Sequence, residues 1–139
     1  MKKYWLILFI FSLFMVACSS QGTDQPSAPA SLTGAWKLTA YGSADAPIPA
    51  VEGADAGLTF NEDGTVTGSS GCNGLGGDYT VEANEITFGE FVSTLMACED
   101  PLMAQEDAAR QVLTDTATYH VVGTTLTLAN NGMVLVLTR

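Results

Sequence analysis

The sequence has few basic residues and no long apolar run. Five Lys and Arg stand against 15 Asp and Glu, and the formal net charge is −10. Nucleic-acid binding relies on Lys and Arg that displace phosphate counterions, so this composition argues against a nucleic-acid partner. The acidic residues are scattered and form no block of like charge, which is typical of a solvated surface.

The apolar run at the start of the chain is too short to cross a membrane as a helix. It covers residues 4–17, which is 14 residues, whereas a spanning helix needs about 20. Lys2 and Lys3 precede it, and a positive start before a short apolar core is typical of a secretory signal. The run ends in Met15-Val16-Ala17-Cys18, which resembles a bacterial lipobox, where the cysteine is lipidated and becomes the mature N-terminus. The alternative is an ordinary signal peptide that happens to contain a cysteine.

These segments predict three parts of the chain. We expect a lipoprotein signal peptide at 1–17, a lipidated flexible tether at 18–31 and a single domain at 32–139. The tether is polar and contains proline, a composition typical of linkers. The domain has 108 residues, which is long enough to bury a hydrophobic core.

A lipid on Cys18 would anchor the protein in a bacterial cell envelope. Two or more acyl chains together hold a protein stably on a membrane, where one chain alone does not. Ser19 is not the aspartate that often retains lipoproteins at an inner membrane, so we expect the outer membrane if the host has one. The mature chain would keep three basic residues: Lys37, Arg110 and Arg139.

Alternating apolar residues and turn signals predict a domain made mostly of strands. The expected elements are a strand in 34–42, hairpins in 57–69 and 78–91, and three strands in 118–139. In the first strand Trp36, Leu38 and Ala40 share one face. Gly64 suits the left-handed position that closes the turn of the first hairpin. Residues 43–57 read as a long loop, since Pro47 and Pro49 disfavour a central strand.

One segment, from Asp100 to about Asp115, predicts a helix. Asp100 can act as its N-cap and Pro101 fits the first helical position. Its apolar stripe, which we expect to cover one side or end of the sheet, consists of Leu102, Ala109, Val112 and Leu113. The expected fold is therefore a β-dominated α+β domain, an antiparallel sheet or partly closed barrel of about seven or eight strands with one α-helix.

Two cysteines remain if Cys18 is lipidated: Cys72 and Cys98. An even pair in an exported protein usually forms a disulfide, because that compartment is oxidising. The bridge would close a loop of 25 residues and contribute on the order of 3 kcal/mol in the chain-entropy model. The alternative is two buried, reduced thiols.

No other pattern points to catalysis or to a cofactor. A zinc or copper site of Cys72, Cys98, His120 and a carboxylate matches no compact zinc module, because the cysteines are single and not paired as C-x-x-C. A nucleophilic Cys–His pair needs a third, orienting group, and alternation turns His120 toward solvent. The Gly-rich stretch at 68–77 lacks the G-K-[ST] of a phosphate loop, and the acidic turn at 61–64 lacks calcium-loop spacing. We therefore expect no catalytic residue, metal or cofactor.

Two signatures of the chain resemble the META domain, the HslJ-like family of bacterial lipoproteins. The first is "FNEDGTVTGSSGCN" followed by "GDY", and the second is "STLMACEDP" followed by the helix. The resemblance covers about residues 32–139 and implies a compact β-rich fold with one helix. It also implies that the motif residues determine the fold: Gly64, Gly68, Gly71, Cys72, Asn73, Tyr79, Met96 and Cys98.

The resemblance implies an association with stress response, motility or antibiotic tolerance, and no established catalytic residues. We therefore expect a non-catalytic, lipid-anchored envelope protein that acts as a stress-response or interaction module with an unidentified envelope protein partner. Fold alone does not define function, and two alternatives stay open. One is a lipoprotein that binds a small ligand, and the other is a thiol-based enzyme.

The Gly-rich stretch at 68–77 is expected to be a corner at the end of a strand. Gly68 and Gly71 would adopt backbone conformations that a β-carbon disfavours. Cys72 would reach toward Cys98 just before the helix, and the glycines at 74, 76 and 77 would carry the chain round to the strand of Tyr79.

Overall fold

The structure, a computed structural model, describes residues 32–139. The expected signal peptide and tether, Cys18 included, lie outside the described residues. The described chain forms one helix, α1 (Asp100–Val112), and ten strands. The strands are β1 (Gly34–Ser43), β2 (Ile48–Pro49), β3 (Ala56–Phe60), β4 (Thr65–Ser70), β5 (Gly74–Glu82), β6 (Glu85–Phe88), β7 (Val92–Ser93), β8 (Thr116–Val122), β9 (Thr125–Asn130) and β10 (Met133–Thr138).

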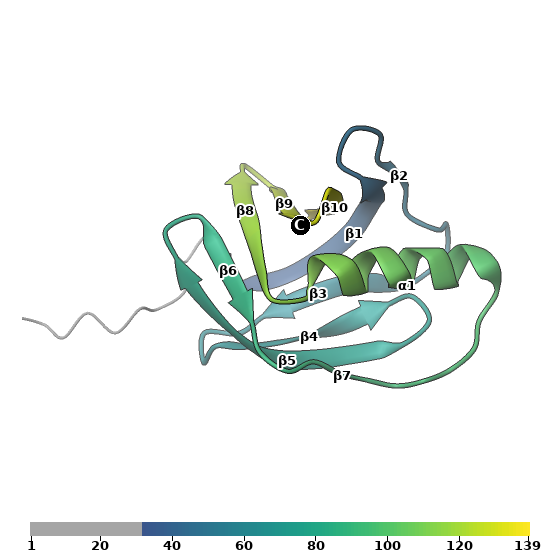
Figure 1. Ribbon diagram of the computed structural model, residues 1–139, viewed down its shortest axis with the longest axis horizontal. Coiled ribbons are helices and arrows are strands. Elements are labelled where there is room, and N and C mark those ends of the chain that lie inside the picture. The colour runs from purple at the N-terminus through teal and green to yellow at the C-terminus, as the bar shows by residue number, and fades with distance from the viewer. Residues whose placement is uncertain (1–31) are drawn as a thin grey trace, which may run out of the picture.

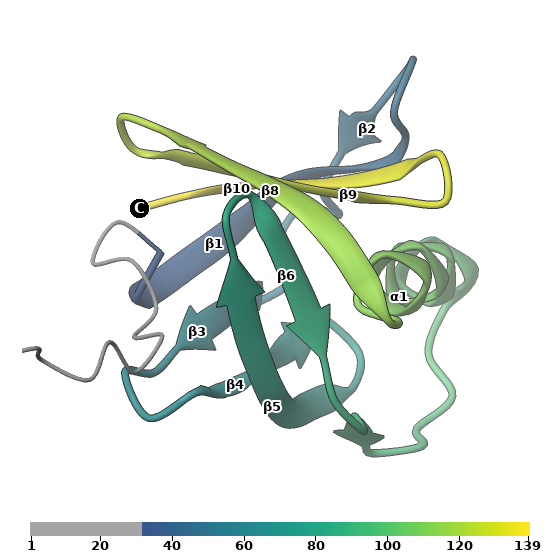
Figure 2. The ribbon, with the colours of Figure 1, turned by 60° about the vertical axis from the view of Figure 1, so that its left-hand side comes forward.

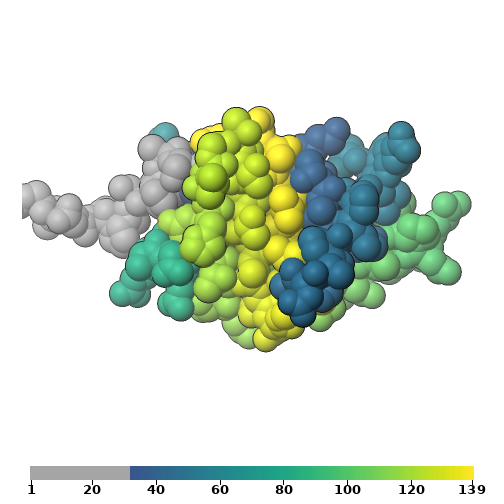
Figure 3. Space-filling model, turned by 90° about the horizontal axis from the view of Figure 1, so that it is seen from above, coloured from purple at the N-terminus to yellow at the C-terminus, as the bar shows by residue number. Residues whose placement is uncertain are grey.

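Eight of the strands close into an antiparallel barrel. Their order is β1-β3-β4-β5-β6-β8-β9-β10, and β10 pairs back with β1. Figure 3 shows this closure, with the yellow C-terminal strand lying beside the blue first strand. The short strands β2 and β7 pair with β1 and β5 and stand outside the ring. The predicted β-dominated α+β fold with one helix is thus confirmed, and the barrel is fully closed.

A bulge in β1 changes which of its side chains face the core. Leu38 pairs with Leu137 and Ala40 with Val136, so Thr39 is an extra residue on the β1 side. A bulge of this kind bends the strand and shifts its alternation. Tyr41 is buried in place of Ala40, so the prediction that Ala40 shares the face of Trp36 and Leu38 is wrong.

The predicted hairpins are present, with small differences in extent. Gly64 has φ +83°, as the left-handed turn position requires. The predicted loop at 43–57 contains the two-residue strand β2, which pairs with Ala40 and Tyr41 of β1. The position of β2 outside the barrel explains how it tolerates proline.

The helix α1 begins and ends differently from the prediction. Its N-cap is Glu99, with no side-chain capping bond, so the prediction that Asp100 caps the helix is wrong. The helix ends at Val112, with Leu113 as its C-cap. It packs against β1, β4, β9 and β10, and Figures 1 and 2 show it lying between the C-terminal strands and β4.

Side chains fill the interior of the barrel. The fully buried residues include Leu32, Phe60, Val66, Ile86, Val112, Leu126, Leu128, Leu135 and Leu137. The Phe60 and Tyr79 rings meet edge to face, with centroids 5.1 Å apart. Voids of about 10 and about 70 Å³ lie between the strands and α1. Both are smaller than the roughly 300 Å³ at which small-molecule pockets begin.

Gly68 allows β3 and β4 to approach each other closely. A Cβ built at Gly68 would overlap the carbonyl oxygen of Gly57 on the facing strand. The φ angle of Gly68 is not positive. The prediction that Gly68 needs an unusual backbone conformation is therefore wrong, and the glycine is required by the close contact.

Replacing Gly68 with alanine should therefore destabilise the domain. The overlap with a backbone atom forces β3 and β4 apart, at a cost of about 2 kcal/mol in unfolding free energy. Gly74→Ala is the matched control, because its nearest atom would lie 4.0 Å away and its φ is not positive. Urea denaturation of both variants measures the difference, and equal midpoints would contradict this account.

Candidate functional site

The corner between β4 and β5 is shorter than the sequence suggests. It consists of residues 71–73, because the glycines at 74, 76 and 77 belong to β5. Gly71 has φ +98°, which confirms the prediction for this glycine. The turn closes through Ser70, whose N–H donates to the Asn73 carbonyl at 2.9 Å. The Asn73 N–H in turn donates to Ser70 Oγ at 3.1 Å.

A disulfide joins this corner to the start of the helix. Cys72 and Cys98 are bonded, and their Cα atoms are 6.0 Å apart. This pairing is the one expected from the sequence. Because Cys98 lies two residues before α1, the bridge ties the helix entrance to the end of β4.

Asn73 connects the corner to the segment before the helix. Its side chain is buried, and Oδ1 accepts hydrogen bonds from Thr94 Oγ1 at 2.7 Å and the Met96 N–H at 2.8 Å. Its Nδ2 donates to the Met96 carbonyl at 3.1 Å and to Glu106 Oε2 at 2.7 Å. Both donors and both lone pairs of the amide are therefore used.

Glu106 of α1 completes the same cluster. Its Oε2 also accepts a hydrogen bond from Ser70 Oγ at 3.0 Å, and its Oε1 pairs with Arg110 at 2.8 Å. Burial alone would raise the pKa of Glu106, but the hydrogen bonds from Asn73, Ser70 and Arg110, with the Arg110 charge, lower it. The carboxylate is therefore held ionised and acts as an acceptor.

Gln105 makes a second link between α1 and the strands. Its Nε2 donates to the Ser70 carbonyl at 2.6 Å, and its Oε1 accepts from the Val51 N–H at 2.8 Å. Gln105 and Glu106 were not among the predicted site residues. The signal was present, because they lie three and four residues after Leu102, on the helix face predicted to be apolar.

The other predicted motif residues stabilise a different part of the barrel. The Tyr79 hydroxyl donates to the Asn61 carbonyl at 2.8 Å, and the Tyr79 N–H donates to the Gly64 carbonyl at 2.7 Å. Burial, followed by the nearby charge of Asp63, raises the pKa of Tyr79. Gly64 and Tyr79 thus fix the 61–64 turn, whereas Gly71, Asn73 and Met96 belong to the corner.

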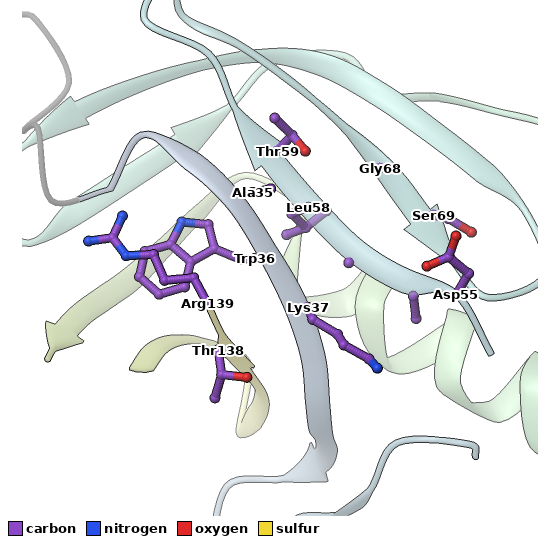
Figure 4. A pocket seen from close by; sticks show the side chains of 12 residues that line it. Ala35, Trp36, Lys37, Asp55, Leu58, Thr59, Gly68, Ser69, Thr138 and Arg139 are labelled. Carbon is purple, nitrogen blue, oxygen red and sulfur yellow. The ribbon is translucent and has the colours of Figure 1, made fainter. Parts of the chain in front are cut away.

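A shallow groove of about 500 Å³ crosses the outer face of β1, β3 and β4. Lys37 and Arg139 line it from one side and Asp55 from the other (Figure 4). The Arg139 guanidinium lies 4.3 Å from the centre of the Trp36 ring, and its Nη1 donates to the Thr33 carbonyl. The groove therefore offers exposed charges and a nearly flat floor.

The described residues supply no assembled metal site. Within residues 32–139, no group of three or more His, Cys, Asp or Glu side chains is placed to hold a metal ion. His120 is exposed on β8, as alternation predicted. The same part of the chain has no helix of the length and hydropathy needed to span a bilayer.

These features define a class: a closed eight-stranded barrel with one helix covering it, and a buried polar corner tied by a disulfide. The chain belongs to the META domain family, which matches residues 30–139. The fold and the family expected from the two motifs are thereby confirmed.

Two solved structures are similar to this chain. An NMR structure of a protein from Burkholderia xenovorans is 27% identical, with a TM-score of 0.63, and the match covers 91% of this chain and 98% of that one. A second NMR structure is 21% identical, with a TM-score of 0.61, over 76% of this chain and 87% of that one, and shows the fold alone. Comparison with curated proteins yields no match.

Replacing Cys72 with serine should lower stability without exposing the core. Without the cross-link to Cys98, the unfolded chain gains conformational entropy. In the chain-entropy model this lowers the free energy of unfolding by about 3 kcal/mol. Urea denaturation with and without reductant measures the effect, and Cys98→Ser should match it. Reductant should lower the midpoint of the wild-type protein and leave both variants unchanged. An unchanged wild-type midpoint would contradict a stabilising bridge.

Replacing Glu106 with glutamine should change the pH dependence of stability. Because the pKa of Glu106 lies below its ordinary 4.5 in the folded protein, its stabilisation is complete above that value and is lost as pH falls through the lowered pKa. The variant should lose about 2 kcal/mol at neutral pH and show a shallower decline in acid. Glu82→Gln, at an exposed position of β5, is the control. Parallel pH profiles for wild type and Glu106→Gln would contradict this role.

Proposed function

We propose that this protein is a non-catalytic, lipid-anchored protein of the bacterial envelope, and that its META domain is an interaction module. The lipobox at residues 15–18 and the polar segment that follows it support anchoring. A role in stress response is the physiological setting that the family resemblance favours.

The proposal that the protein is non-catalytic depends on one observation, which is that the disulfide and hydrogen bonds of the corner occupy its reactive groups. Its reactive groups are all engaged, since Cys72 is bonded to Cys98 and the Asn73 amide has four hydrogen bonds. The Glu106 carboxylate accepts three hydrogen bonds, one of which is the bond from Asn73. A nucleophile or general base needs a free lone pair directed at a substrate. These contacts support a structural role for the cluster.

A small-ligand function is the second candidate, and the outer groove is the observation that favours it. The voids beside α1 are only about 10 and about 70 Å³, so a ligand would have to occupy a groove on the outer surface, such as the one beside Lys37 and Arg139. That groove is open, and neither of its two cations is buried. Pockets that bind small ligands are mostly concave and bury most of the ligand surface. The interaction module is therefore the preferred proposal.

Replacing Cys18 with serine tests the anchor. Wild-type protein expressed in a bacterial host should incorporate an alkyne-labelled fatty acid and sediment with membranes. The variant should lose both properties, because the thiol that carries the lipid is gone. Val16→Ala, which keeps an apolar residue before the cysteine, is the matched control and should stay labelled. Membrane association of the Cys18→Ser protein at the wild-type level would contradict lipid anchoring.

Deletion of the gene then tests the physiological part of the proposal. Strains that lack the protein should survive heat or antibiotic exposure less well than the parent. Wild-type protein should restore survival, whereas Cys18→Ser protein should not, because it would not reach the membrane. Equal survival of the parent and the deletion strain would count against a stress role.

A further inference from the structure

Large apolar side chains gather on the segment between β6 and α1. Five such side chains are exposed in the described chain, and three of them lie within five residues. Val92 is 73% exposed, Leu95 89% and Met96 57%. Apolar residues scattered singly are ordinary on a surface, whereas large exposed apolar patches mark interaction sites, and three such residues on one short segment favour that interpretation. We call residues 92–96 the 92–96 edge; it includes β7 and runs below β5 in Figure 1.

The inner side of the 92–96 edge is held in place by specific bonds. The Thr94 N–H donates to the Gly74 carbonyl at 3.1 Å, and both backbone groups of Met96 bond to Asn73. The disulfide at Cys98 fixes the chain two residues further on. The apolar side chains therefore lie on an ordered backbone. Binding of a partner would not lose affinity to the entropy cost of ordering this segment.

The outer side of the 92–96 edge offers unpaired backbone groups. Within residues 32–139, neither the N–H nor the C=O of Leu95 makes a hydrogen bond to the protein. The strand that pairs with β7 is β5, and it lies on the inner side. An extended segment with a free edge is a template for an added strand. A groove of about 390 Å³ adjoins this edge, lined by residues 74–76 and 92–94.

The charges around the 92–96 edge favour some kinds of binding partner over others. Glu90, Glu99 and Asp100 are exposed at its two ends. Among the described residues, the basic residue closest in sequence is Arg110, which is already paired with Glu106. An anionic bilayer would be repelled by these carboxylates, and a second copy would bring the same acids to the contact. A partner that carries Lys or Arg is complementary.

We propose that the 92–96 edge docks an extended segment of a partner protein, which pairs with the backbone at Leu95. The segment carries alternating apolar side chains with Lys or Arg at its ends. This inference rests on the proposed function, since it specifies the surface and the partner chemistry of the interaction module. Main-chain pairing supplies affinity in such contacts, and the alternate side chains supply selectivity.

Peptide binding tests the proposal directly. The probe is the fluorescent peptide KKVTVTVKK, and its binding to the mature full chain carrying Cys18→Ser is followed by anisotropy at low salt. Saturable binding is expected. Leu95→Ser should weaken it about tenfold, whereas Val122→Ser should leave it unchanged. Val122 is the matched control, because it is 76% exposed and lies on β8.

Two altered peptides separate the components of the contact. EEVTVTVEE should bind at least tenfold more weakly, because it faces Glu90, Glu99 and Asp100 with like charge. A peptide N-methylated at every residue of its VTVTV segment should bind as weakly, because neither of its edges can form the strand ladder. Melting curves with and without reductant show that each protein variant keeps its fold and its disulfide.

Several results would overturn the proposal. They are the absence of saturable peptide binding, equal affinity for wild type and Leu95→Ser, and equal affinity for the N-methylated peptide. Flotation of the lipid-free protein with phosphatidylglycerol vesicles, lost in Leu95→Ser, would assign the edge to a membrane and would also overturn it. The fatty-acid labelling and survival experiments test the proposed function separately, because their outcomes do not depend on Leu95.

Discussion

The side chain of Asn73 joins three segments that lie far apart in the sequence. It joins the corner after β4 to the Thr94 hydroxyl, the Met96 backbone and the Glu106 carboxylate through four hydrogen bonds. A buried polar group costs free energy unless it is paired. Moving any one of the three segments would leave an amide or a carboxylate without a partner, so this contact sets where α1 lies against the barrel.

The cluster around Asn73 determines the position of α1 more than it adds to the net stability of the domain. Removing one partner of a buried, hydrogen-bonded charge is costly, because the remaining groups are left unpaired. Glu106 accepts hydrogen bonds from Ser70 and Asn73 of the strands and the corner, and therefore specifies one position of the helix and disfavours others. Every buried side-chain nitrogen or oxygen of residues 32–139 has a hydrogen-bond partner, which is what makes such a polar cluster compatible with the surrounding core. The disulfide acts on the same junction through the unfolded chain.

The two sides of the 92–96 edge differ in whether their backbone groups and side chains are free to contact another molecule. On the inner side the backbone of Met96 is saturated by Asn73, and this saturation supports the proposal that the corner performs no chemistry. On the outer side Leu95 exposes both its backbone and its side chain. The bonds that support a structural role for the corner thus also present the surface that we propose for a partner.

The sequence by itself determined the alternation, the turns and the family motifs, because these depend on residues close together in the chain. Asn130–Gly132 and Gly64 specify turns locally, and the strands on either side of them were predicted. Tertiary structure alone decided the bulge at Thr39, the close contact that requires glycine at residue 68 and the hydrogen-bond partners of Gln105 and Glu106. Each of these depends on a strand or corner distant in sequence: β10, the Gly57 carbonyl and Ser70. Contacts of that kind exist only once the barrel has closed.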